Sequence, residues 1–105
     1  MAIDKNTAEI ITLEEAIDFT HSFQTRNPDE LKSFFVGINK LNLILEQKDC
    51  VGLRIYNGYS TETRKNNMVL VGVDEKGEDI TNGIILENLF PCPPDCPKSS
   101  PLIKR

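Results

Sequence analysis

The chain has 105 residues, of which 39% are hydrophobic and 27% charged, and its formal net charge is −4. This composition is typical of one soluble globular domain, and it excludes a disordered chain and a membrane protein. The acidic balance disfavours nucleic acid and anionic membrane surfaces as partners. The first residues lack the apolar stretch of a secretory signal, so we expect a cytoplasmic protein.

The first predicted helix begins after Thr12 and ends near Arg26. Thr12 and Glu15 have the spacing of a capping box, in which each side chain accepts a hydrogen bond from the other residue's amide. Apolar and small residues then follow helical spacing on one stripe, formed by Leu13, Ala16, Ile17, Thr20 and Phe23. The residues before Thr12 have a mixed pattern and predict a loose arm.

A second helix is expected from Asn27 to about Gln47. Asn27 suits an N-cap, a proline follows it at the first helical position, and Glu30 completes another capping box. The core stripe of this helix would consist of Leu31, Phe34, Phe35, Ile38, Leu41 and Leu45. Val36 and Leu43 would lie on the opposite face, either beneath the N-terminal arm or as a small exposed patch that contacts a partner.

The next part of the chain predicts strands. Residues 50–56 alternate between apolar and polar, and residues 67–73 are apolar on both faces, which indicates a central strand. The polar linker 57–66 is long for a hairpin, and long polar loops often carry function. A third strand is expected either at 79–80 or at 83–86.

These elements predict an α+β fold in which two N-terminal helices are followed by a small antiparallel sheet of about three strands. Residues 1–90 would form this single domain, and residues 91–105 an irregular tail rich in proline and cysteine. Five of the last sixteen residues are proline. Because proline has no amide donor, regular structure is expected to stop at Phe90.

The chain has three cysteines, and two of them, Cys92 and Cys96, lie among the prolines of the tail. An extended polyproline segment would separate their Cα atoms by roughly 12 Å, whereas a disulfide needs them within about 7 Å. Both a disulfide and a shared metal ion therefore require a turn, for which Pro94-Asp95 is suited. Because disulfides are rare in a reducing cytoplasm, the three cysteines are interpreted as inert hydrophobic residues, metal ligands or reactive thiols.

Cys92 and Cys96 could form a tetrahedral zinc site together with Cys50 and His21. The spacing matches zinc signatures poorly, because one pair is close in sequence and the other is scattered. Alternatively, Cys50 is buried at the start of a strand, His21 flanks a helix, and the tail is a rigid strap. Redox cycling of the two tail cysteines is a third interpretation, although their prolines exclude the helix N-terminus that lowers thiol pKa values in thioredoxin-like catalysis.

Residues 50–83 (CVGLRIYNGYS…MVLVGVDEKGEDITNG) and the PCPPDC of the tail resemble a family of small uncharacterised bacterial proteins. This resemblance implies that the strands and the tail belong together, and it implies no activity. The VGLRIY strand after a helix is also similar to the A-type iron–sulfur carriers, which then have a Gly-Gly-Cys turn and a C-terminal Cys-x-Cys. Residues 57–60 and the Cys-x-x-x-Cys of the tail depart from that pattern, so the second resemblance implies no cluster.

The remaining features favour binding over catalysis. His21 is the single histidine, and neither a nucleophile elbow nor a phosphate-binding glycine loop is present in the sequence. A basic and aromatic cluster around the polar linker consists of Arg54, Tyr56, Tyr59, Arg64 and Lys65. Basic and aromatic residues together can bind single-stranded nucleic acid, but the acidic composition argues against that ligand.

We therefore expect a non-enzymatic protein-binding or adaptor domain that binds a protein partner or self-associates, without nucleic acid, membrane or cofactor. The candidate partner surface consists of Val36, Leu43, Arg54, Tyr56 and Tyr59. The alternative is a metal-binding or redox thiol protein that uses Cys92 and Cys96, with zinc as the candidate metal.

Overall fold

The computed structural model describes residues 3–105, which divide into two compact units. The sheet unit contains the described residues up to Thr7 and residues 34–90, and the helix–tail unit contains residues 8–33 and 91–105. The chain passes between the units within β1 (Ser33–Phe35) and β5 (Phe90–Cys92), which pair in a two-stranded sheet. The predicted α+β class is confirmed. Neither helix among residues 3–105 has the length and apolar character needed to cross a membrane.

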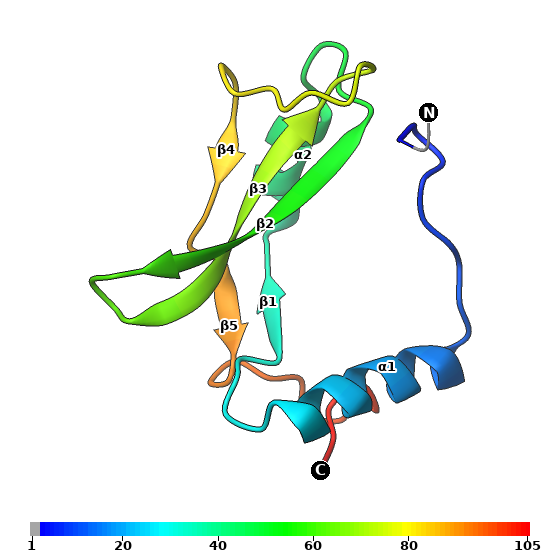
Figure 1. Ribbon diagram of the computed structural model, residues 1–105, viewed down its shortest axis with the longest axis vertical. Coiled ribbons are helices and arrows are strands. Elements are labelled where there is room, and N and C mark those ends of the chain that lie inside the picture. The colour runs from blue at the N-terminus through cyan, green and yellow to red at the C-terminus, as the bar shows by residue number, and fades with distance from the viewer. Residues whose placement is uncertain (1–2) are drawn as a thin grey trace. The chain divides into compact units, whose positions relative to one another are not determined.

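The sheet unit contains a three-stranded antiparallel sheet in the order β2-β3-β4, with bounds Gly52–Ser60, Lys65–Val73 and Ile85–Leu86. The β2–β3 hairpin pairs along its full length, so residues 61–64 alone form its loop (Figure 1). The expectation of a long polar linker at 57–66 is therefore wrong. Backbone pairing does not depend on side-chain polarity, and the ladder continues through the polar residues beyond the buried part of the sheet.

Both segments proposed for the third strand contribute to the sheet. Asp79 forms an isolated antiparallel bridge with Val73, and Ile85 pairs with Val71 in β4. The two segments are separated by a turn that contains Gly83. The third strand is therefore interrupted, and each half contacts a different part of β3.

Helix α2 (Ile38–Leu45) packs against one face of the hairpin (Figure 1). The core of the sheet unit consists of the buried Ile44, Leu70 and Leu89, with the partly buried Phe34, Val36, Cys50, Leu53, Met68 and Leu86 packed against it. Gly72 allows a close approach, because an added Cβ would lie 3.2 Å from Ile44 Cγ2 and 2.9 Å from Gln47 Nε2. Helix and sheet are therefore in direct contact at this glycine.

The predicted start of the second helix is wrong. Asn27 ends α1, because its backbone amide and its side-chain Nδ2 both donate to Phe23 O. The chain then turns, forms β1, and enters α2 through Gly37 as the N-cap. Aromatic residues at 34 and 35 followed by a valine favour a strand, and this preference outweighs the helical spacing of the same residues.

Helix α1 (Leu13–Arg26) begins as predicted. Thr12 Oγ1 accepts a hydrogen bond from the Glu15 amide, and Glu15 Oε1 accepts from the Thr12 amide, which completes the capping box.

At the other end of the chain, the expectation that regular structure stops at Phe90 is wrong. Pro91 lies within the short strand β5, in a two-stranded sheet where a missing donor can face away from the partner strand.

Candidate functional site

The sheet unit contains an apolar groove with a volume of about 430 Å³. It is lined by Phe35, Val36, Gly37, Lys40, Leu86, Glu87, Asn88, Leu89 and Phe90. One wall comes from the residues that enter α2, and the other comes from the chain that leaves β4. The volume lies in the range of pockets that accept small ligands or side chains.

The floor of the groove is held in place by Asn67 in β3. Asn67 Nδ2 donates to Leu89 O, and Leu89 N donates to Asn67 Oδ1, both at 3.0 Å. These two bonds replace a strand ladder where the chain bends, with Asn88 in the left-handed region at φ 62°. Leu89 is therefore buried in the core while the next residue, Phe90, projects outward.

The rim of the groove combines aromatic rings with one charge of each sign. Phe35 is 69% exposed and Phe90 is 60% exposed. Lys40 and Glu87 are also exposed, and within residues 3–105 neither forms an ion pair. Large exposed rings beside an apolar hollow are typical of a surface that binds another molecule.

The five residues of the predicted partner surface lie on different elements and have different surroundings. Val36 lines the groove and packs against the core. Leu43 is 46% exposed on α2, and Tyr59 is exposed in the distal half of β2. Arg54 and Tyr56 belong to a polar cluster with Asp79. Only Val36 is thus shared between the predicted surface and the groove.

The polar cluster of Arg54, Tyr56 and Asp79 ties the turn after β3 to strand β2. Arg54 Nη1 donates to Asp79 Oδ1 at 2.5 Å and to Gly77 O at 3.2 Å, while the Tyr56 hydroxyl donates to Asp79 Oδ2. The hydrogen bond from Tyr56, followed by the interactions with Arg54, holds the Asp79 pKa below its usual value. The same bond to Asp79 raises the Tyr56 pKa. Both carboxylate oxygens are occupied, which indicates a structural role.

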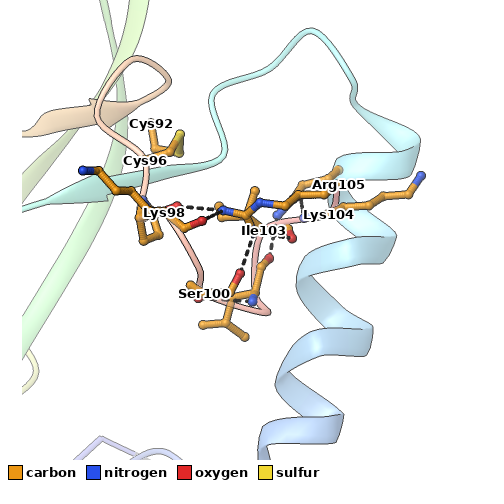
Figure 2. The surroundings of a disulfide bond; sticks show 10 residues. Cys92, Cys96, Lys98, Ser100, Ile103, Lys104 and Arg105 are labelled. Atoms are coloured by element: carbon orange, nitrogen blue, oxygen red, sulfur yellow. Dashed lines mark hydrogen bonds between the residues drawn. A yellow bond between two sulfur atoms is a disulfide. The ribbon is translucent and has the colours of Figure 1, made fainter.

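Cys92 and Cys96 are joined by a disulfide, with their Cα atoms 4.7 Å apart (Figure 2). A turn brings them together, as the spacing required. It lies one residue earlier than expected, at Pro93-Pro94, and Asp95 N donates to Pro91 O across it. The structure shows these two cysteines bridged, whereas the sequence favours inert hydrophobic residues, metal ligands or reactive thiols.

The other two proposed zinc ligands have separate environments. His21 Nε2 lies 2.9 Å from Pro101 O in the helix–tail unit. Cys50 belongs to the sheet unit, where its Sγ donates to Gly52 O. No group of three or more His, Cys, Asp or Glu side chains among residues 3–105 could hold a metal ion. Zinc binding therefore stays a prediction without support from this arrangement.

The tail is docked on α1 within the helix–tail unit. The buried Gln24 donates from Nε2 to Leu102 O at 3.0 Å and accepts at Oε1 from Lys104 N at 2.7 Å. The Arg105 guanidinium donates to four carbonyls of the tail, those of Pro97, Lys98, Ser100 and Ile103 (Figure 2). Sequence reasoning missed both residues, because a glutamine on a helix and a terminal arginine usually lie in solvent.

Comparisons with protein-family models, with curated proteins and with solved structures found no match. Function is therefore inferred from the apolar groove, its rim and the disulfide.

Proposed function

We propose that this chain is a non-enzymatic protein-binding module that takes up an apolar segment of a protein in the apolar groove. The exposure of Phe35 and Phe90 beside the hollow carries the proposal. Aromatic rings hold much of the contact area of protein interfaces and lose little conformational entropy on binding. In the free protein these rings are exposed to water, so a partner that covers them makes the free energy of association more favourable.

The magnitude of this gain sets the size of the interface. Burying a phenylalanine side chain contributes about 1.5 to 3 kcal/mol, whereas association costs about 4 to 15 kcal/mol in lost freedom. Two rings therefore do not suffice, and the partner must also cover neighbouring apolar surface. Ile38, which begins α2 and is 70% exposed, offers such surface next to groove residue Gly37.

The polar groups of the chain support a binding role over catalysis. Both oxygens of Asp79, the carboxylate of the polar cluster, already accept hydrogen bonds. A general base needs a free acceptor within reach of a substrate proton. We also propose that the protein acts in the cytoplasm, where the Cys92–Cys96 pair is expected to be largely reduced. Fractionation of cells that express the protein would test this location.

The test is a comparison of Phe90→Ser with Ile10→Ser in the full chain. Ile10 is fully exposed, so its replacement removes apolar surface without touching the groove. We expect Phe90→Ser to weaken self-association or protein capture at least tenfold, measured by light scattering and by pull-down, while Ile10→Ser behaves as wild type. Equal behaviour of both variants and wild type would contradict a role for the groove.

A redox function is the second candidate, and the Cys92–Cys96 disulfide favours it. A dithiol protein could donate two electrons and two protons to this disulfide. The Cys92–Cys96 bond then breaks to give two thiols, and the donor is left with a disulfide of its own. Equilibration in glutathione buffers, with thiols counted by mass spectrometry, measures the potential of the couple. A potential below about −300 mV marks a structural disulfide and would contradict redox cycling.

A further inference from the structure

We infer that the partner of the apolar groove is a second copy of this chain, bound in a two-fold symmetric dimer. This inference rests on the proposed function, since it names the protein that the groove binds. The groove supplies both parts of such a contact, because it has a hollow that can receive a side chain and exposed rings that can fill one.

Two-fold symmetry sets a strict condition on the surface. The same patch lies on both sides of the interface, so it must be complementary to itself in shape and in charge. In shape, Phe35 and Phe90 of each copy can cover the hollow of the other. The lining also includes the apolar Val36, Leu86 and the buried Leu89 beside the polar Lys40, Glu87 and Asn88, so covering the hollow removes mainly apolar surface from water.

The charges on the rim meet the same condition. Lys40 and Glu87 line one groove yet form no ion pair within the described residues, with each other or with another side chain. In a two-fold pair, Lys40 of one copy can face Glu87 of the other, and symmetry repeats this contact. The pairing occurs twice, so both signs on both rims are matched.

The neutral rim of the groove limits charge repulsion at this contact. The chain carries a net charge of −4, so two copies repel each other on average. The groove rim has one positive and one negative residue and is neutral as a whole. The rim therefore adds no repulsion of its own to the net repulsion between the two copies.

Charge reversal tests the inference directly, with self-association measured by sedimentation velocity over a range of concentrations. We expect wild type to dimerise, and Lys40→Glu and Glu87→Lys each to weaken the dimer at least tenfold, because each puts like charges at both contacts. An equal mixture of the two variants should form a heterodimer, since both contacts then join opposite charges. The double variant should recover the wild-type dimer.

Lys48→Glu is the matched control, because Lys48 is exposed after α2 and does not line the groove. It should dimerise as wild type does. A dimer that ignores the groove reversals, or a mixture of variants that stays monomeric, overturns the inference. A wild type that is a monomer at every concentration would also overturn the inference that the partner is a second copy. Protein capture that depends on Phe90 would then leave the proposed function standing, and capture that ignores Phe90 would overturn both.

Discussion

The two units of this protein are stabilised by different interactions. In the sheet unit, the buried side chains are the apolar Ile44, Leu70, Val71, Val73 and Leu89. In the helix–tail unit, the buried residues among those described are the polar Gln24 and the disulfide-bonded Cys92. Apolar burial and a strand ladder thus stabilise the first unit, whereas a covalent link and side chain–backbone hydrogen bonds stabilise the second.

The difference follows from how much apolar surface each segment can bury. The helix–tail unit has roughly 40 residues in two separate pieces, a size at which an apolar core alone seldom suffices. Small folded segments of this size usually need a disulfide, a metal or another staple. The four predictions below test this contrast, beginning with the largest expected effect.

Ile44→Ala should destabilise the sheet unit by about 2 to 5 kcal/mol, because Ile44 is fully buried and its loss leaves a cavity. Hydrogen exchange of β3 amides measures this free energy. Leu43→Ala is the control, since Leu43 is 46% exposed and should lose well under half as much. Equal losses for the two variants would mean that α2 does not pack as described.

Cys96→Ser should destabilise the helix–tail unit by about 2 kcal/mol, the chain-entropy value for a loop of this length. The loop is short, with a sequence separation of 4 between the cysteines. Exchange of α1 and tail amides should accelerate, while β3 amides keep their protection. Wild type treated with a dithiol reductant should behave in the same way. An equal loss in β3 would show that the two units unfold together.

Gln24→Ala should destabilise the docked tail by about 1 to 2 kcal/mol, because the carbonyl of Leu102 and the amide of Lys104 lose their partner. Faster exchange at residues 100–105 is the expected readout. Ser22→Ala on the exposed part of the same helix is the control and should leave this exchange unchanged. An unchanged rate in Gln24→Ala would mean that Arg105 and the disulfide hold the tail without it.

The polar cluster should make the sheet unit sensitive to pH at both extremes. The Asp79 pKa lies below its ordinary value of 3.8, so its contribution is present above that pH and is lost as pH falls through the native pKa. The Tyr56 pKa lies above its ordinary value of 10.0, so its contribution is present below that pH and is lost as pH rises. Denaturant unfolding at several pH values measures both limbs.

Asp79→Asn is the control for the acid limb, because an amide has no proton to gain in this range. The variant should be less stable at neutral pH, and its stability should fall less steeply below pH 4 than that of wild type. If stability falls below pH 4 as steeply in the variant as in wild type, other carboxylates cause the loss of stability in acid.

Part of the candidate site was accessible from sequence. Val36 was marked as a partner residue, and it does line the groove, although as part of its wall and not as the back of a helix. Helical spacing predicts Phe35 in a core stripe, and Phe90 is expected only as the last residue before the irregular tail, so the sequence indicates neither rim residue. The position of Phe90 depends on the bonds between Asn67 and Leu89, which are 22 residues apart and whose pairing leaves no local signal. Phe35 lies in β1, whose pairing with β5 also joins distant parts of the chain.

By itself the sequence determined the features that depend on neighbouring residues. The capping box at Thr12, the apolar residues of β3 and the need for a turn between the tail cysteines all follow from short-range geometry. Tertiary structure decided whether Asn27 begins or ends a helix, how far β2 and β3 pair, and where Gln24 finds its partners. Those outcomes depend on contacts between distant parts of the chain, whose free energies outweigh local preferences of a few tenths of a kcal/mol per residue.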